Sequence, residues 1–296
     1  MFKGSTVALV TPFKNNKVDD QKLKDLVEFQ IKNGTNGLLP CGTTGESPTL
    51  NYEEHEHVIE VVIQASRGRV PVMAGTGSNS TDEAIMLTQH AAKAGANAAL
   101  IVSPYYNKPN QEGLYRHFKA IADSVNIPIY LYNIQGRTAV NIETETVARL
   151  ARDCKNIVGV KEASGSLDQM QAVKMACPKN FILLSGDDAL TLPVLAIGGE
   201  GVISVVGNIL PKETSQICAL YFAGKIAEAR ELHYKILPVV KAMFMDTNPV
   251  PVKLAAELMG LCSSDVRLPL CEMDEIKKKK LQNVLETYGI LKGQLC

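Results

Sequence analysis

The sequence predicts an α/β protein that folds as a (β/α)8 barrel with a C-terminal helical extension. Short apolar runs rich in β-branched residues alternate with amphipathic stretches of helical period, which is typical of βαβ units around a parallel sheet. Eight such units follow one another, and 296 residues accommodate a barrel of about 250 residues plus an extension. A doubly wound open sheet is the alternative, because periodicity alone does not show closure.

The eight apolar runs are the expected barrel strands, and the stretches after them are the expected helices. The strands are expected at 5–10, 36–40, 70–75, 98–103, 128–133, 156–161, 181–186 and 201–206. The helices are expected near 19–33, 51–66, 81–94, 111–125, 143–153, 166–176, 188–197 and 211–223. Glycines follow several of the helical patterns, and Ser80 and Asn110 stand where N-caps belong.

Helical pattern continues after the eighth unit, which ends near residue 224. It runs through 225–246, 250–260 and 274–289. We therefore expect a barrel domain over 1–224 and a helical domain over 225–296. The motif NPVPVK at 248–253 places two prolines between two of these helices, which favours a fixed bend over a flexible linker.

The composition argues against nucleic-acid or membrane partners, a disulfide framework and a thiolate zinc site. Hydrophobic residues make up 46% and charged residues 21%, an ordinary globular mixture, and 31 Lys plus Arg balance 31 Asp plus Glu. No net field favours nucleic acid or a membrane surface as a partner. The seven cysteines include no C-x-x-C pair, which argues against a disulfide framework or a thiolate zinc site. With no signal-like or membrane-spanning apolar run, a cytoplasmic location is expected.

Reactive side chains collect where the expected strands end, which is where a barrel of this kind carries its chemistry. The segments concerned are CGTTGE at 41–46, SPYYNKP at 103–109, YNIQGRT at 132–138, KEASG at 161–165 and GDD at 186–188.

Lys161 is the most informative of these residues. An amine that ends an apolar strand loses hydration, and desolvation favours its neutral form. A neutral lysine is a nucleophile for carbonyl groups and can form a Schiff base. The alternative is a structural lysine that pairs with Glu162 or with the C-terminus of a helix.

Imine chemistry also needs a group that moves protons, and a phenol can donate and accept them. Tyr105, Tyr106 and Tyr132 stand at neighbouring strand ends, although any one of them could simply pack under a loop. The GTTGE turn offers hydroxyls and backbone N–H groups to a carboxylate, or is only a tight turn. Arg137 could bind a second carboxylate, or form a surface ion pair.

Other motifs do not qualify as cofactor or metal sites. GTGSNS at 75–80 lacks the third glycine of a dinucleotide fingerprint. His55 and His57 are expected to face different ways on one helix, so they are not a metal pair. Asp187 and Asp188 are expected to cap the following helix rather than hold an ion. No metal and no cofactor are therefore expected.

These motifs, in their order and spacing, resemble the dihydrodipicolinate synthase family over essentially the whole chain. The resemblance rests on GTTGES (42–47), AGTGSN (74–79), PYYNKP (104–109), YNIQGRT (132–138), GVKEASG (159–165), SGDDA (185–189), GGEGVISV (198–205) and NPVPVK (248–253). It implies a class I aldolase-type lyase of lysine biosynthesis that condenses pyruvate with L-aspartate 4-semialdehyde. It also implies a homotetramer built from tight dimers.

The resemblance also implies roles for individual residues. Lys161 would form the pyruvate imine and Tyr132 would relay protons. Thr43 would link Tyr132 to Tyr106, which would arrive from a neighbouring subunit. Thr44 would bind the carboxylate of pyruvate, and Arg137 would bind the carboxylate of the aldehyde. The backbone of Gly186 and Ile203 would line the pocket.

Five further positions match the allosteric pocket of lysine-sensitive members of the family: Ser47, His55, Asn79, Glu83 and Tyr105. L-Lysine is therefore the expected feedback inhibitor, at a site away from Lys161. Because Tyr105 and Tyr106 are consecutive, ordering the first could displace the second. Pro48 and Tyr52 replace residues common in the bacterial pattern.

Two other functions remain alternatives. A sibling lyase, of the N-acetylneuraminate lyase or 2-keto-3-deoxy sugar acid aldolase type, would share the lysine and the tyrosine. GTTGE rather than GSTGE, together with Arg137, favours the synthase. Gln135 stands where the family usually has proline, which would stiffen the loop carrying Arg137. A catalytically silent sensor of a keto acid or amino acid is the third possibility.

Overall fold

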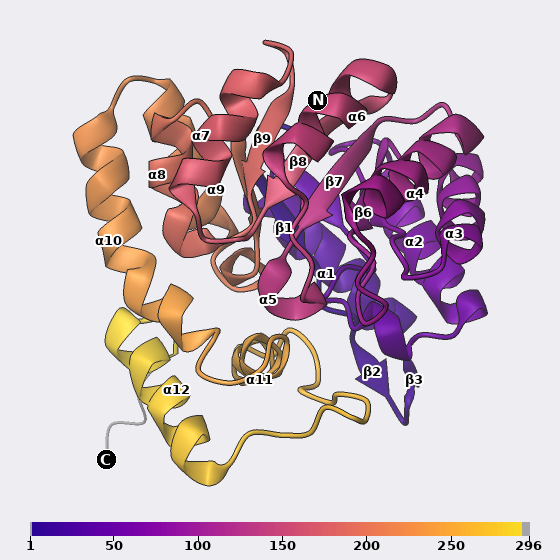
Figure 1. Cartoon of the computed structure of the whole chain (residues 1–296). Coiled ribbons are helices and arrows are strands. Elements are labelled where there is room, and N and C mark those ends of the chain that lie inside the picture. Colours follow the sequence, from indigo (N-terminus) through magenta and orange to yellow (C-terminus); the bar gives the residue numbers. More distant parts are fainter. Residues whose placement is uncertain (1, 292–296) are drawn as a thin grey trace, which may run out of the picture.

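The structure, a computed structural model, describes residues 2–291, and its eight parallel strands curl into a barrel ringed by helices (Figure 1). Each strand overlaps one expected apolar run, so the predicted fold class is confirmed. The strands are β1 (Gly4–Ala8), β4 (Gly37–Leu39), β5 (Met73–Gly75), β6 (Ala98–Val102), β7 (Ile129–Asn133), β8 (Ile157–Glu162), β9 (Ile182–Ser185) and β10 (Gly201–Ser204).

The strand order shows how the barrel closes. Neighbouring strands pair in the order β4-β1-β10-β9-β8-β7-β6-β5, and the two ends of this series meet through one parallel bridge between Leu38 and Val72. The alternative of a doubly wound open sheet is therefore wrong. Closure places the carboxyl ends of all eight strands around one opening.

The surrounding helices follow the expected pattern closely. They are α1 (Asp20–Lys32), α2 (Tyr52–Ser66), α3 (Thr81–Ala94), α4 (Gln111–Ser124), α6 (Thr144–Asp153), α7 (Leu167–Ala176), α8 (Thr191–Ala196) and α9 (Pro211–Phe222). The two expected N-caps are confirmed, because Ser80 accepts from the Glu83 N–H and Asn110 from the Gly113 N–H. A short helix, α5 (Gln135–Thr138), directly follows β7, and 3₁₀ turns lie at Ser47–Thr49 (η1), Asp188–Leu190 (η2) and Val206–Asn208 (η3).

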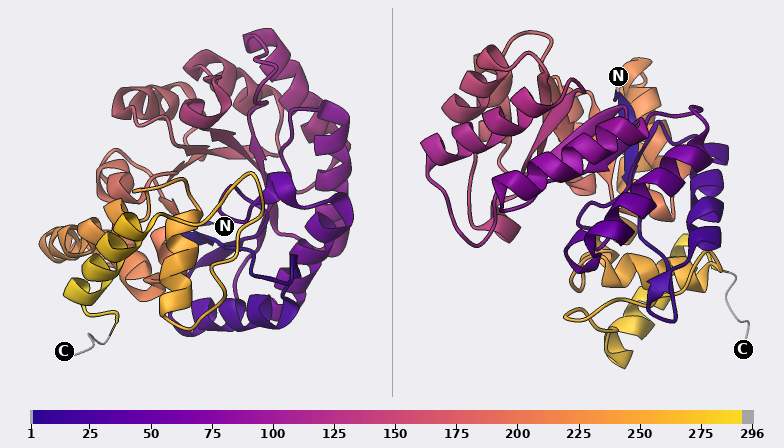
Figure 2. Two further views of the ribbon diagram at one scale, coloured as in Figure 1. Left: turned by 90° about the horizontal axis from the view of Figure 1, so that it is seen from below. Right: turned by 90° about the vertical axis from the view of Figure 1, so that its right-hand side faces the viewer.

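Three helices form the C-terminal part, as expected: α10 (Ile226–Ala242), α11 (Val250–Leu258) and α12 (Glu275–Tyr288). α11 lies across the end of the barrel at which α5 follows β7, as both views of the ribbon show (Figures 1 and 2). One hydrophobic cluster joins Val206 of the barrel to Val239, Val252 and Leu281 of these helices. The division into two domains at residue 224 stays a prediction, since the two parts share this core.

A small hairpin was missed by the sequence analysis. β2 (Phe13–Lys14) and β3 (Lys17–Val18) pair antiparallel around Asn15 and Asn16, whose φ angles are 52° and 59°. Two consecutive positive φ angles define the two-residue turn that suits a hairpin, and asparagine tolerates them. The Asn-Asn pair was the available signal.

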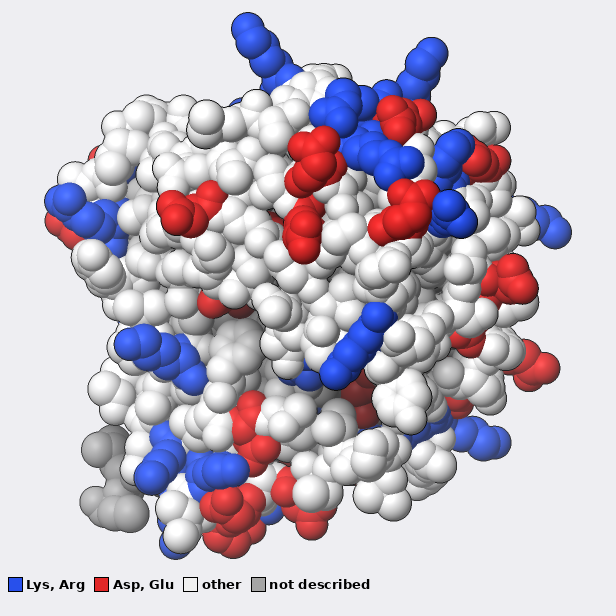
Figure 3. All heavy atoms as spheres, in the orientation of Figure 1, with Lys and Arg blue, Asp and Glu red and all other residues white. Residues whose placement is uncertain are grey.

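The described surface carries both charges. In the face shown in Figure 3, lysines and arginines lie among aspartates and glutamates, in line with the balanced composition. Within residues 2–291, none of the helices has the combination of length and hydropathy that crossing a bilayer requires.

Candidate active site

Lys161 and Tyr132 lie side by side inside the barrel. β7 and β8 are neighbours, and their register pairs Tyr132 with Lys161. The Lys161 Nζ is 3.9 Å from the centroid of the Tyr132 ring, and the two residues are only 6% and 5% exposed. Leu131 and Val160, one position earlier, pack in the cluster between strands and helices. Strand alternation therefore turns the amine and the phenol inward together.

The structural alternative for Lys161, a pair with Glu162, is wrong. Glu162 is fully buried on the opposite face of β8, where its carboxylate accepts from the side chains of Asn133 (3.0 Å) and Gln169 (3.1 Å) and from the Ser164 N–H (2.8 Å). None of the ion pairs among residues 2–291 includes Lys161. Its amine is therefore not neutralised by a structural partner.

Gly186 leaves room for the lysine side chain. A Cβ at this position would lie 3.2 Å from Lys161 Cε and 2.6 Å from Ala163 Cβ, so any larger residue would press on the lysine. Ile203, on β10, belongs to the same interior cluster as Tyr132. Both residues that the resemblance assigns to the pocket lining thus lie in or beside the barrel interior.

The turn at residues 42–46 carries the two threonines. The Glu46 N–H donates to the Thr43 carbonyl over 3.1 Å, which keeps the turn tight. Thr44 is buried, and its hydroxyl accepts from the Asn248 amide over 3.1 Å. A residue from the segment before α11 therefore reaches the turn that is expected to hold a carboxylate.

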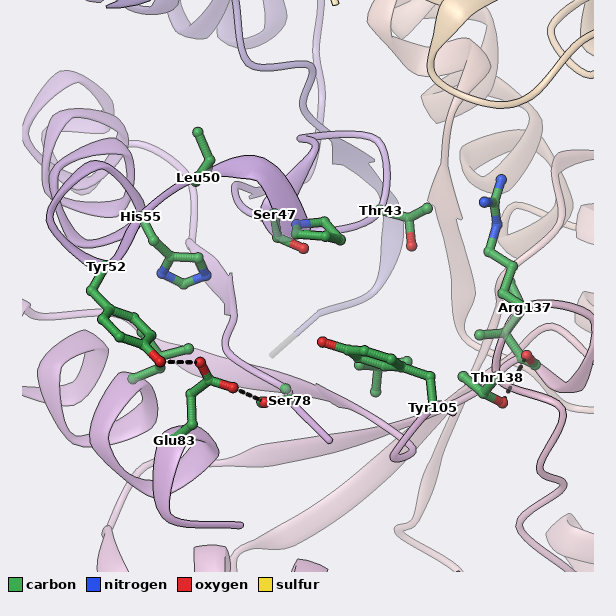
Figure 4. Close-up of a pocket in the computed structure, with 15 residues that line it drawn as sticks. Thr43, Ser47, Leu50, Tyr52, His55, Ser78, Glu83, Tyr105, Arg137 and Thr138 are labelled. Atoms are coloured by element: carbon green, nitrogen blue, oxygen red, sulfur yellow. Dashed lines mark hydrogen bonds between the residues drawn. The ribbon is translucent and has the colours of Figure 1, made fainter. Parts of the chain in front are cut away.

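A cavity of about 350 Å³ opens at this end of the barrel (Figure 4). Thr43 and Arg137 lie on one side of it, His55 and Glu83 lie on the other, and the Tyr105 ring stands between them. The lining residues are Thr43, Ser47, Pro48, Leu50, Tyr52, His55, Gly77, Ser78, Glu83, Leu87, Val102, Tyr105, Ile134, Arg137 and Thr138.

Arg137 lies at the mouth of the site on α5. Its side chain is exposed, and one guanidinium nitrogen is 3.5 Å from the Asn248 carbonyl, so it can accept a further anionic partner. Gln135 is the first residue of α5, a position that also suits proline. Lys161 and Tyr132 do not line the cavity; they lie on the adjoining strands inside the barrel.

The residues expected to bind an effector surround the other side of the cavity. The Glu83 carboxylate accepts from the hydroxyls of Tyr52 and Ser78. Burial lowers the pKa of His55 to about 4, so its imidazole is neutral near pH 7. Ser47, at the start of η1, completes this side. Four of the five residues expected to bind an effector therefore line the same cavity as Thr43 and Arg137.

The consecutive residues Tyr105 and Tyr106 lie in different environments, one in the cavity wall and the other in solvent. Tyr105 lines the cavity, where burial, followed by the nearby Glu83 carboxylate, raises its pKa. Tyr106 is 89% exposed and has a φ of 71°, which rotates it out of the cavity wall. Asn79 does not line the cavity, but its amide donates to the Tyr105 carbonyl over 3.2 Å.

Of the positions set aside as metal sites, His55, His57 and Asp187 have the surroundings that were expected, whereas Asp188 does not cap the helix that follows it. His57 lies outside the cavity and contacts Asp20 over 2.9 Å, whereas His55 is buried, so the two rings diverge. Asp187 caps the 3₁₀ turn η2, and Asp188 accepts from two backbone N–H groups before η3 and at its start. In the described part of the chain, no three His, Cys, Asp or Glu side chains gather as metal ligands would.

Three residues of the site were missed by the sequence analysis: Asn248, Lys253 and Glu46. Asn248 and Lys253 belong to the NPVPVK motif, which was interpreted as a bend and as one of the motifs of the family resemblance, but with no role for its side chains. Their contacts join segments more than 200 positions apart, which no local pattern reveals.

The fold and the site define a (β/α)8 barrel with a buried amine and a phenol side by side in its interior and a cavity at the carboxyl ends of its strands. A family model described as the dihydrodipicolinate synthetase family matches residues 1–288. The chain belongs to this family.

Individual relatives match over nearly the full length. The 4-hydroxy-tetrahydrodipicolinate synthase of Endomicrobium trichonymphae is 58% identical over 292 residues, which cover 99% of this chain and 100% of the relative. The chloride-inhibited dihydrodipicolinate synthase of Acinetobacter baumannii, solved with pyruvate, is 45% identical with a TM-score of 0.96, covering 98% of this chain and 100% of that one. The enzyme from Cyanidioschyzon merolae, solved with lysine bound, is 41% identical with a TM-score of 0.95, covering 98% and 99%.

Proposed function

We propose that this chain is a lyase of the class I aldolase type that catalyses the 4-hydroxy-tetrahydrodipicolinate synthase reaction. It joins pyruvate to L-aspartate 4-semialdehyde in lysine and diaminopimelate biosynthesis, in the cytoplasm and with no metal or organic cofactor. The observation that carries the proposal is the buried contact between Lys161 and Tyr132 at 3.9 Å. Full-length relatives that bear the name of this enzyme support it.

The chemistry starts at the amine of Lys161. Its lone pair attacks the keto carbon of pyruvate, and loss of water gives an imine. Loss of a methyl proton turns the imine into an enamine, whose carbon attacks the aldehyde of the second substrate. The amino group of that substrate then displaces the lysine as the ring closes, which frees Lys161 for another cycle. The amine lies over the Tyr132 ring, and the hydroxyl of this phenol is assigned the exchange of protons in these steps.

Two carboxylates need partners during this sequence. The turn at 42–46 offers the Thr44 hydroxyl and its backbone N–H groups to the pyruvate carboxylate. The exposed guanidinium of Arg137 binds the carboxylate of the aldehyde, where a charge-assisted contact orients its reacting end. A solved relative that contains pyruvate supports pyruvate as the ligand.

Tyr106 is assigned to the site of a neighbouring subunit. At 89% exposure its phenol projects from the chain that carries it, which suits a group that completes the proton relay through Thr43 of a second copy. A homotetramer formed as a dimer of dimers would supply that arrangement.

L-Lysine is the proposed feedback inhibitor. Glu83 can bind an ammonium, while Asn79 and the Tyr105 hydroxyl can hold a carboxylate. Ser47 and His55 complete the binding site. A solved relative with lysine bound supports this proposal.

The decisive experiment is a coupled assay with pyruvate and L-aspartate 4-semialdehyde. We expect turnover with this pair, and none with the variant Lys161→Ala. N-acetylneuraminate and 2-keto-3-deoxy sugar acids serve as comparison substrates. Cleavage of either at a higher kcat/KM would establish a sibling lyase, and an absence of turnover with every substrate would favour the sensor.

A further inference from the structure

A buried ion pair connects α11 to the turn that carries Thr43 and Thr44. The Lys253 Nζ is 2.7 Å from Glu46 Oε1, and the two side chains are 0% and 1% exposed. Lys253 also donates to the Thr11 carbonyl over 2.9 Å. The other Glu46 oxygen accepts from the backbone N–H of Arg267 over 3.0 Å. Both oxygens of this carboxylate are therefore held by the C-terminal part of the chain.

Fold stability alone is a poor explanation for this pair. Removing two charges from water costs several kcal/mol per ion, and a hydrophobic pair of similar volume is often as stable. Burial lowers the pKa of Lys253, and the Glu46 carboxylate opposes that shift. Glu46 also has a φ of 55°, a left-handed conformation that is costly for a residue other than glycine. Glu46, which ends the turn, therefore carries both the free-energy cost of a buried charge and the conformational cost of a left-handed backbone.

The same C-terminal segment reaches the turn at a second point. Asn248 donates to the Thr44 hydroxyl over 3.1 Å, and its carbonyl lies 3.5 Å from Arg137. The segment from Asn248 to Lys253 thus contacts the group expected to hold the pyruvate carboxylate and the group expected to hold the aldehyde carboxylate. Among these contacts, the ion pair is the one that fixes the far end of the turn.

We propose that Glu46 and Lys253 are positioning residues for pyruvate. Neither side chain is placed to touch a substrate. The pair holds Glu46 in its left-handed conformation, which presents the Thr44 hydroxyl and the N–H groups of the turn to the pyruvate carboxylate. The inference rests on the proposed function, because it assigns a task to the pyruvate-binding turn.

The test compares Glu46→Gln, Lys253→Met and the double variant that combines them. Each single change leaves one buried charge without its partner, so we expect a lower melting temperature as well as weaker pyruvate binding. The double variant buries no unpaired charge but lacks the tether. We expect its melting temperature to recover while the KM for pyruvate stays raised about tenfold, the effect of one lost charge-assisted contact. Its KM for the aldehyde and its kcat should change far less.

A matched control separates positioning from general loosening. Val173→Ala removes buried volume from α7, in a hydrophobic cluster that contains no residue of the turn, and should lower the melting temperature without changing the KM for pyruvate. A double variant with the wild-type KM for pyruvate would overturn the proposal, and so would a raised KM in the control. If the single variants do not fold, the double variant alone decides.

Failure of this inference is distinguishable from failure of the proposed function. The wild-type chain is first treated with pyruvate and borohydride. If no adduct forms, the proposed function fails and the positioning role fails with it. If an adduct forms and the double variant binds pyruvate normally, only the positioning role is lost.

Discussion

At the residue scale, the ends of neighbouring strands bring the side chains of the site together. Lys161 and Tyr132 were identifiable from sequence because each stands at or next to the end of an apolar strand, where alternation and register determine which face a side chain takes. Glu162 follows the same alternation: it comes one position after Lys161, so its side chain lies on the opposite face of β8, outside the barrel interior. The contact between Thr44 and Asn248 was not predictable, because it depends on how a distant segment docks.

The role of Arg137 is tested by Arg137→Ala. The exposed guanidinium is assigned to the aldehyde carboxylate, and losing such a charge-assisted contact costs about 1.5–3 kcal/mol, or roughly ten- to a hundredfold in kcat/KM. Steady-state kinetics should show this loss for the aldehyde, while imine formation with pyruvate is nearly unchanged. A parallel fall in imine formation would make the arginine structural.

At the element scale, the helix N-caps could be predicted from the sequence, whereas the short hairpin and the contacts of the 248–253 bend could not. The N-caps at Ser80 and Asn110 were predictable because their side chains satisfy N–H groups of their own helices. The hairpin at 13–18 is too short for an apolar period, so it was missed. The bend at 248–253 was recognised, but its contacts with the barrel come from tertiary packing alone.

The loop that follows β6 carries both Tyr105, which lines the cavity, and Tyr106. Measuring inhibition by L-lysine tests the proposed coupling between these two residues. L-Lysine should lower the initial rate without competing with pyruvate, because it is assigned to the side formed by Glu83, His55 and Tyr105. Glu83→Gln should weaken the inhibition about tenfold or more by removing the charge that binds the ammonium. His57→Gln, on the same helix as His55 but outside the cavity, is the control. Inhibition purely competitive with pyruvate would reject a separate effector subsite.

The packing of α3 against α4 predicts a pH dependence of stability. His117 on α4 is buried against Thr81 of α3, and burial lowers its pKa from 6.5 to about 4. The unfolded chain therefore binds more protons than the folded chain between about pH 6.5 and 4, so the free energy of unfolding falls as pH drops through this range. Removing this titration with His117→Gln should reduce the fall by about 3 kcal/mol, measured by urea unfolding at several pH values. Equal pH slopes for the two proteins would show that His117 is not the group responsible.

At the scale of the whole molecule, the barrel and the C-terminal helices form one functional unit. The alternation of strands and helices predicted the barrel, and closure became visible only through the bridge between Leu38 and Val72. Sequence did not show that α11 would lie across the active end of the barrel, because that placement follows from a hydrophobic core shared by distant segments. Truncation at residue 224 would therefore remove part of the site.

Assembly is tested by mixing two inactive variants. In the proposed arrangement, Tyr106 of one subunit serves Lys161 of another. Tyr106→Phe and Lys161→Ala should each have little activity alone. Unfolding and refolding them together should restore part of it, because a mixed pair contains one site with both groups intact. No gain over the separate variants would place Tyr106 outside the partner's relay.

The most direct test of the central claim is borohydride reduction in the presence of pyruvate, followed by peptide mass mapping. An imine between pyruvate and the buried amine is reducible to a stable adduct, so the account predicts one modified lysine, Lys161, and no adduct without pyruvate. The Lys161→Ala variant should remain unmodified. An adduct on a different lysine, or none at all, would contradict the account.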